Sequence, residues 1–274
     1  MPLGTPNGFD ALPPPEMAEH AERVGVKKAA LPWDTTLMLA VLGGAFIALG
    51  GVFAVVASTG SAALPFGVAR VLTGVAFSLG LVLVVVGGAE LFTGNNLIVM
   101  AWVSGKIRLS QLLRNWALVY LGNLVGAVAT AGLCFVAGLH QLGQGAVGEA
   151  ALASAHGKLG YGFLQAFALG VLANVLVCLA VWLSFSARST TDRILAVVPP
   201  VAAFVAAGFE HSVANMFFLP FAMAIEAARG APTFSVGQLW LANLIPVTLG
   251  NLVGGSGLVG LVYWRIYLRR ARAA

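Results

Sequence analysis

Three ionisable residues lie inside long apolar stretches of the chain. Glu90 stands alone between Arg70 and Lys106, and Glu210 and His211 stand together in a second stretch. Ionisable side chains in such apolar surroundings are costly, and they usually mark a site with a function. The imidazole of His211 could donate a hydrogen bond to a weak acid or exchange a proton with it. The alternative is a buried ring that only satisfies its neighbours.

For Glu90 and Glu210 we expect a structural role, in which each carboxylate accepts backbone N–H bonds and so supports a broken helix. Glycines at 87, 88 and 94 flank Glu90 and mark the place where a helix would be interrupted. Helix ends exposed at such a break offer free N–H donors and a partial positive charge. Two breaks aimed at one point would suit a small anion or a polar solute.

No catalytic residue, metal site or cofactor is expected. The chain has no His-Glu-x-x-His word and no Gly-x-Ser-x-Gly word, and its carboxylates are not clustered. Glu210 and His211 are adjacent, so their side chains would point about 100° apart on a regular helix. Cys134 and Cys178 lack metal-ligand spacing and are expected to fill the core. An integral-membrane enzyme is therefore the least favoured class.

The composition identifies the elements that must position these residues. Of the 274 residues, 59% are hydrophobic and only 9% are charged, whereas an ordinary soluble domain has roughly 25% charged residues. This excludes an enzyme with a solvated surface, and the apolar content excludes a disordered chain. The mean hydropathy of +0.92 indicates a multi-pass, all-α membrane protein, with the lipid bilayer as its partner.

Charge-free runs determine the number of membrane spans, because a helix needs about 20 apolar residues to cross the hydrocarbon core. The runs predict six spans, at roughly 35–58, 70–102, 110–138, 159–185, 193–228 and 237–268. The second and fifth are longer than a straight crossing requires. Since each carries one glutamate near its middle, we expect transmembrane helices 2 and 5 to be broken at the midplane.

Repeated words indicate a duplication. Leu-Gly-Asn-Leu-Val-Gly occurs at 121–126 and again at 249–254, and both Glu90 and Glu210 are followed by an asparagine five residues later. Chance similarity is the alternative. An odd number of spans per half predicts two inverted three-helix repeats. We expect an N-terminal segment at 1–33, a channel domain at 34–268 with repeats at about 34–138 and 159–268, and a C-terminal tail at 269–274.

The basic residues predict the orientation. With six spans, twelve of the 15 fall on the side of the termini: Arg23, Lys27, Lys28, Lys106, Arg108, Arg114, Arg188, Arg193, Arg265, Arg269, Arg270 and Arg272. The other three are Arg70, Lys158 and Arg229. By the positive-inside rule both termini are cytoplasmic. Anionic lipid rather than nucleic acid then explains the pI of about 9.6.

With these residues in view, the chain resembles the formate/nitrite transporter family of bacterial anion channels, from about Met17 to Leu268. The most specific words are Glu-Leu-Phe-Thr at 90–93, Gly-Phe-Glu-His-Ser-Val-Ala-Asn-Met at 208–216 and Asn-Leu-Ile-Pro-Val-Thr-Leu-Gly-Asn at 243–251. Leu-Pro-Phe-Gly at 64–67 is closest to the formate branch. The resemblance implies an aquaporin-like fold in a homopentamer, with one pore through each protomer.

The resemblance also implies roles for individual residues. His211 is then the central pore histidine, with Thr93 opposite it and Asn215 in the second break. The inner constriction matches Leu81, Leu91 and Phe204, and the outer constriction matches Phe77 and Phe92. Lys158 and Asn174 match a pair in the outer vestibule that attracts anions, although a lone lysine at a helix end is more often a snorkelling anchor.

The implied function is passage of formate, linked to a proton at His211, across the bacterial inner membrane. Nitrite, hydrosulfide and short monocarboxylates stay open as substrates, because these pore residues do not separate them. A neutral-solute channel is less favoured, since the Asn-Pro-Ala words of the water and glycerol channels are absent. The direction of transport and any gating by the N-terminal segment are left open by the sequence.

Overall fold

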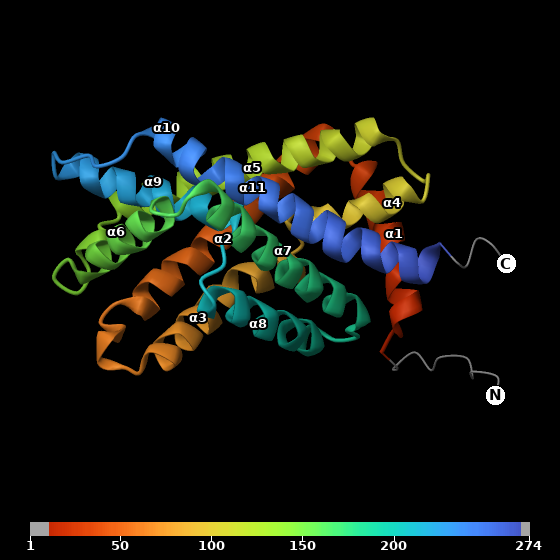
Figure 1. Cartoon of the computed structure of the whole chain (residues 1–274), viewed down its shortest axis with the longest axis horizontal. Helices are drawn as coiled ribbons and strands as arrows, with labels where there is room; N and C mark the ends of the chain where they lie inside the picture. The colour runs from red at the N-terminus through yellow and green to blue at the C-terminus, as the bar shows by residue number, and fades with distance from the viewer. Residues whose placement is uncertain (1–10, 270–274) are drawn as a thin grey trace.

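The computed structural model describes residues 11–269, and every regular element in this range is helical (Figure 1). The predictions for residues 1–10 and 270–274, at the two ends of the chain, lie outside the described residues. The helices are α1 (Pro14–Ala29), α2 (Trp33–Ser58), α3 (Phe66–Gly87), α4 (Val99–Val103), α5 (Leu109–Val136), α6 (Ala146–Leu159), α7 (Phe163–Ser186), α8 (Thr190–Ala206), α9 (Ser212–Ala228), α10 (Val236–Gln238) and α11 (Ile245–Leu252).

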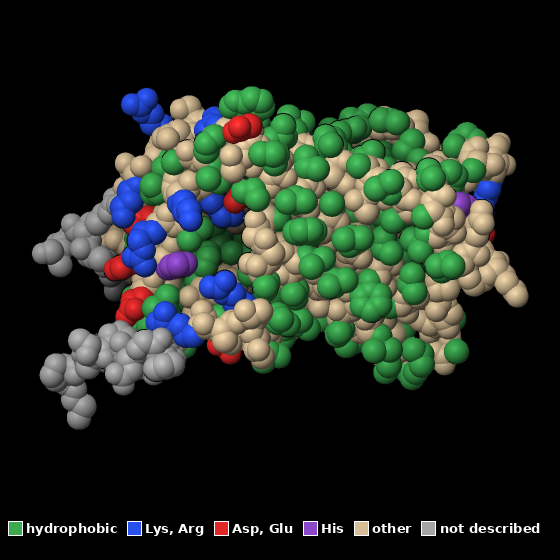
Figure 2. Space-filling model, turned by 180° about the vertical axis from the view of Figure 1, so that it is seen from behind, with side chains coloured by type: hydrophobic (Ala, Val, Ile, Leu, Met, Phe, Trp, Pro, Cys, Tyr) green, Lys and Arg blue, Asp and Glu red, His purple; other side chains and the backbone are tan. Residues whose placement is uncertain are grey.

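Five helices in the described range are long and apolar enough to cross a membrane. They are α2, α3, α5, α7 and a continuous C-terminal helix, Val236–Leu268, which contains α10 and α11 joined by wider turns. Figure 2 shows charged side chains gathered at the end of the molecule that carries the termini, beside a broad belt of apolar and uncharged side chains. The described part of the chain is therefore all-helical, with helices able to span a membrane, as the composition predicts.

Two interruptions separate shorter helices at the expected places. After α3 ends at Gly87, helical turns resume only at Gly94 and continue into α4. After α8 ends at Ala206, α9 begins at Ser212. Each first half is followed by a glycine with positive φ, 84° at Gly88 and 76° at Gly208. A residue without a Cβ adopts this conformation at low cost, so each glycine turns the chain sharply out of its helix.

Two short helices, α1 and α6, lie toward opposite ends of the molecule (Figure 1). α1 begins with Pro14, whose missing N–H is no loss in a first helical turn. It lies in the N-terminal segment predicted at 1–33, whereas α6 was not expected from the sequence. The 14 residues of α6 are too few for a span and mix alanine with Glu149, His156 and Lys158, so no apolar run marks them.

The glycines of the repeated words bring helices into backbone contact. A Cβ added to Gly126 of α5 would lie 1.9 Å from the carbonyl oxygen of Val41 in α2. A Cβ added to Gly254 of the C-terminal helix would lie 2.2 Å from the carbonyl oxygen of Val171 in α7. Close approach of this kind is the usual way in which helices pack in a membrane. The repeated word is therefore explained in part by helix packing.

We expect Gly126→Ala to destabilise the protein, because the new methyl group would push α5 away from α2. Overpacking of this kind costs about 1–3 kcal/mol. Gly132→Ala on the same helix is the matched control, since a Cβ there meets no atom within 4 Å. Thermal unfolding of the purified protein in detergent would measure the difference. Equal melting temperatures for the two variants would contradict the close contact.

Candidate functional site

Asn123 of α5 holds the first interruption in place. Its Oδ1 accepts the backbone N–H of Phe92 at 2.9 Å, and its Nδ2 donates to the carbonyl oxygens of Glu90 at 2.9 Å and Ala40 at 2.7 Å. The side chain is fully buried. These three bonds satisfy both polar groups of the Asn123 amide. Two of them, to Phe92 and Glu90, replace bonds that the backbone of a continuous helix would make within itself.

Asn251 holds the second interruption in the same way. Its Oδ1 accepts the N–H of Ser212 at 3.0 Å, and its Nδ2 donates to the carbonyl oxygens of Glu210 at 3.0 Å and Gly170 at 2.7 Å. Both asparagines belong to the repeated words, and their role was missed from sequence. The sequence contained a signal for this role, because the same asparagine recurs in both copies of the word. A buried amide requires hydrogen-bond partners, so the recurrence indicates two matched sets of them.

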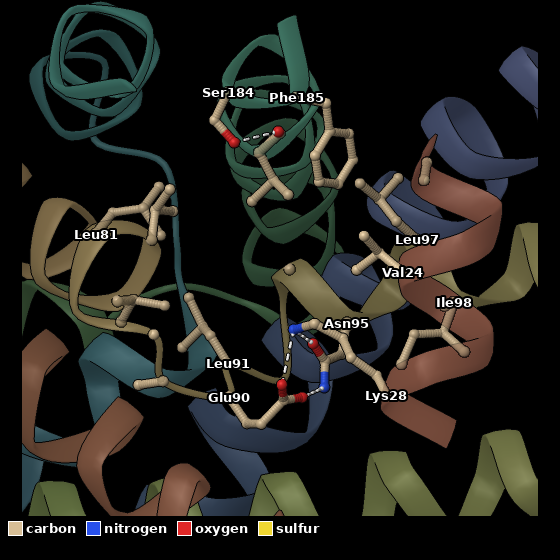
Figure 3. Close-up of a pocket in the computed structure, with 18 residues that line it drawn as sticks. Val24, Lys28, Leu81, Glu90, Leu91, Asn95, Leu97, Ile98, Ser184 and Phe185 are labelled. Atoms are coloured by element: carbon tan, nitrogen blue, oxygen red, sulfur yellow. Dashed lines mark hydrogen bonds and ion pairs between the residues drawn. The ribbon is translucent and has the colours of Figure 1, made fainter. Parts of the chain in front are cut away.

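The carboxylate of Glu90 lies in a network of side chains (Figure 3). Lys28 of α1 is 3.0 Å from its Oε1, and Asn95 Nδ2 donates to its Oε2 at 2.6 Å. Lys28 also donates to Asn95 Oδ1 at 2.7 Å, and Asn95 Nδ2 lies 2.9 Å from Asn115 Oδ1. The charge of Glu90 is thus balanced by Lys28, for which the sequence predicted only a place on the side of the termini.

The carboxylate of Glu210 has an equivalent network. Lys158 Nζ of α6 donates to Oε1 at 2.8 Å, while Asn215 and Asn243 donate to Oε2 at 2.7 and 3.1 Å. The expectation that the two carboxylates accept backbone N–H bonds is therefore corrected. Their partners are lysine and asparagine side chains, because Asn123 and Asn251 already take up the backbone groups of the interruptions.

His211 lies directly before α9 and contacts the other interruption. Its Nε2 is 2.8 Å from Thr93 Oγ1, and its Nδ1 accepts the backbone N–H of Ala214 at 3.0 Å, which caps the helix. Since Nδ1 is an acceptor, the single proton of the neutral ring is on Nε2. His211 therefore donates to Thr93, and the hydroxyl proton of Thr93 is left to point elsewhere.

Two cavities approach this contact from opposite sides. The α1 cavity, of about 240 Å³, is lined by α1 and by Leu81, Glu90 and Leu91 (Figure 3). The α6 cavity, of about 450 Å³, is lined by α6 and by His211 and other residues. They share no lining residue. A buried layer therefore separates them, and it contains Phe77, Leu81, Leu91, Phe204 and His211, each at most 3% exposed.

Two aromatic residues of the expected constrictions, Phe204 and Phe92, have surroundings that the sequence did not predict. Phe204 lines the α6 cavity together with Phe77, whose ring is 5.7 Å away, and it stacks on His211 at 5.9 Å. Phe204 was expected on the other side of the layer, with Leu81. Phe92 lines neither cavity, and its ring packs edge-on against Tyr120 at 4.9 Å because Asn123 holds its backbone against α5.

Asn174 was expected in the outer vestibule and Asn215 in the pore, but neither residue lines the α1 or the α6 cavity. Asn174 is fully buried on α7 and donates to the carbonyl oxygen of Asn251 at 2.7 Å and that of Thr93 at 3.3 Å. It lies behind the interruptions and does not line the α6 cavity with Lys158. Asn215 is likewise buried in the Glu210 network and lines neither cavity.

Comparison with known proteins identifies the relatives of this chain. The family model described as "Formate/nitrite transporter" matches residues 15–265. The chain belongs to the formate/nitrite transporter family. It is 46% identical over 276 residues to formate channel FocA of Escherichia coli K12, covering 96% of this chain and 97% of FocA. The formate channel FocA of Haemophilus influenzae is 39% identical over 270 residues, covering 92% and 93%.

A solved structure extends the comparison to the fold. A "Pentameric formate channel with formate bound" is similar with a TM-score of 0.80 and 44% identity, covering 86% of this chain and 98% of that chain. As a formate/nitrite transporter family member the chain is a membrane transport protein, and family identity supports the expectation that it is not an enzyme.

We expect Asn251→Asp to lower the stability of this family member, because the carboxylate loses both donors to Gly170 and Glu210. Gly170 lies inside α7, so it is the carbonyl oxygen of Glu210, outside any helix, that is left without a partner, at a cost of about 1–3 kcal/mol. Gln144→Glu adds the same negative charge in an exposed loop and serves as the control. Thermal unfolding in detergent compares the two. An Asn251→Asp variant as stable as the control would show that the interruption does not depend on this amide.

Proposed function

We propose that this protein is a homopentameric channel that passes formate across the bacterial inner membrane. The observation that carries the proposal is the buried Thr93–His211 hydrogen bond of 2.8 Å in the layer between the α1 and α6 cavities. The similarity to two formate channels and to a pentameric formate channel structure supports the substrate and the assembly.

The proposed architecture is aquaporin-like, with six spans in two inverted three-helix repeats and a midplane break in spans two and five. The matched bonds of Asn123 and Asn251 and the matched networks of Glu90 and Glu210 support two related halves. The predicted repeats, about 34–138 and 159–268, leave out Lys28 and Lys158. Because each lysine completes the network of its half, we place α1 with the first repeat and α6 with the second.

We also propose that both termini are cytoplasmic. Basic side chains gather at the end of the molecule that carries the termini, which agrees with the positive-inside rule (Figure 2). In this orientation the α1 cavity is the inner vestibule and the α6 cavity is the outer vestibule. The layer between them, with Phe77, Leu81, Leu91, Phe204 and His211, is then the constriction of the pore.

In the proposed passage, formate enters a vestibule as an anion and meets an apolar layer. A bare anion is very costly there, whereas formic acid costs far less. The Nε2–H of His211 and the hydroxyl of Thr93 are polar donors within the layer, and the N-terminus of α9 adds partial positive charge. Formate first accepts the free hydroxyl hydrogen bond of Thr93 and then replaces Thr93 as the acceptor of the His211 Nε2–H. It receives a proton there and crosses the layer as the neutral acid.

The Ala214 cap controls the proposed proton transfer. If the neutral ring gave up its only proton it would become an imidazolate, so a second proton, taken from water in the α6 cavity that His211 lines, must reach Nδ1. The step then leaves formic acid and a ring that is neutral again. Nδ1 accepts the N–H of Ala214, and this bond must open before Nδ1 can take a proton. The cap thus keeps the ring in its neutral, hydrogen-bonding form until an anion lies beside it and compensates the charge of the imidazolium.

The variant His211→Asn tests the proton step, because asparagine can still cap α9 and still donate an N–H but cannot titrate. We expect the unaltered protein to pass formate with a strong dependence on pH between 5 and 7, and the variant to pass it with little dependence. Formate uptake into proteoliposomes measures both. Unchanged pH dependence in the variant would rule out a proton relay through His211.

The substrate is tested separately, because nitrite, hydrosulfide and short monocarboxylates share the charge of formate. Currents from the purified protein in a planar bilayer are compared for formate, nitrite and hydrosulfide at pH 5 and 7. We expect formate to give the largest flux. A larger flux of nitrite or hydrosulfide would reassign the substrate within the family, and swelling of liposomes in glycerol without anion flux would indicate a neutral-solute channel.

A further inference from the structure

The α6 cavity contains two basic residues and one acidic residue, and only one of the basic residues is paired. Lys158 Nζ lies 2.8 Å from Glu210 Oε1 and 5.3 Å from the centre of the Phe218 ring. Its side chain is 17% exposed. The charge of Lys158 is therefore largely cancelled by a carboxylate in hydrogen-bond contact, which weakens its attraction for an anion in the cavity.

Arg70 of α3 lines the same cavity and has no such partner. Its Nε donates to the carbonyl oxygen of Ala206 at 2.9 Å and its Nη2 to that of Val205 at 2.7 Å, at the end of α8. Across residues 11–269 no Asp or Glu is within salt-bridge distance of its guanidinium. The partial negative charge of a helix end offsets at most about half of a full charge.

The guanidinium also lies close to the second interruption. A Cβ added to Gly208 would be 3.1 Å from Arg70 Nη2, so the guanidinium lies directly beside the glycine that turns the chain out of α8. Gly208 is three residues before His211, which lines the same cavity. The unpaired charge of Arg70 is therefore in the part of the α6 cavity that leads to the histidine.

The α1 cavity has no equivalent charge. Its lining includes Lys28 and Glu90, which pair with each other at 3.0 Å, and no further charged residue. The α6 cavity thus has one positive charge in excess, while the charges of the α1 cavity are balanced. A cleft with an excess of one sign raises the local concentration of ions of the opposite sign.

We propose that Arg70, and not Lys158, is the residue that draws the anion into the α6 cavity and positions it for His211. The inference rests on the proposed function, since it assigns a role in anion entry. Two of the N–H groups of Arg70 are used by helix α8, and Nη1 has no hydrogen bond to any residue in 11–269. The planar guanidinium can therefore offer free donors to a carboxylate at no loss to its own support.

The test is formate influx through Arg70→Gln at formate concentrations far below saturation. We expect influx about five-fold lower than that of the unaltered protein at low ionic strength, as a unit charge acting across a few ångströms of water would give. At high salt, where the Debye length falls to about 3 Å, the difference should shrink below about two-fold. Arg70→Lys keeps the charge and should recover most of the influx.

Arg229→Gln is the matched control. Arg229 pairs with Glu149 at 2.8 Å outside the α6 cavity, so this variant changes the net charge equally and leaves the cavity charge intact. A second variant, Ser154→Glu, adds a carboxylate to the cavity lining without touching the bonds of Arg70 to α8. It should reproduce the salt-dependent loss even if Arg70→Gln fails to fold.

The outcomes separate this inference from the proposed function. No formate flux in the unaltered protein would overturn the proposed function. Normal flux in the unaltered protein, with Arg70→Gln and Ser154→Glu indistinguishable from Arg229→Gln, would overturn the role of Arg70. A loss of influx in Arg70→Gln that is the same at all salt concentrations would assign Arg70 to the support of α8 and would likewise overturn it.

Discussion

The structure depends on how two interrupted helices keep their backbone polar groups satisfied in an apolar environment. An exposed N–H or C=O group in hydrocarbon costs several kcal/mol, so a span can be broken only where protein supplies partners. Asn123 and Asn251 supply them, each with one acceptor and two donors fixed on a neighbouring helix. The loops at 88–93 and 207–211 can therefore leave the helical path while the backbone groups that these two asparagines bind stay satisfied.

The same constraint explains why the charged residues near the loops are paired. Glu90 and Glu210 would each be an isolated charge without the lysine contributed by α1 or α6. The two halves differ at the next residue, where Leu91 follows Glu90 and His211 follows Glu210. Only the second loop therefore presents an ionisable ring to the layer between the cavities. The chemistry of the site comes from this difference between two otherwise matched loops.

Sequence reasoning located the two loops and drew attention to His211, because charge and glycine stand out against an apolar background. It missed α6, since a short helix with mixed composition has no periodic signal that distinguishes it from a loop. It did not predict the surroundings of Phe92 and Asn174, because the order of residues along the chain does not tell which distant helix each of them contacts. Phe92 packs toward α5 and Asn174 lies behind the loops. In both cases the cause is a hydrogen bond between an asparagine side chain and a backbone group that is distant in the sequence.

The pairing of Lys158 was unpredictable for a similar reason, since its partner Glu210 lies 52 residues away along the chain. What all the proposed chemistry requires is a neutral His211 with its proton on Nε2, facing Thr93. Nitrogen-15 NMR of protein labelled in the histidine rings, with His211→Asn used to assign the signal, measures this directly. At pH 7 we expect His211 to show an unprotonated Nδ1 and a protonated Nε2. A ring protonated on Nδ1, alone or on both nitrogens, would contradict the account.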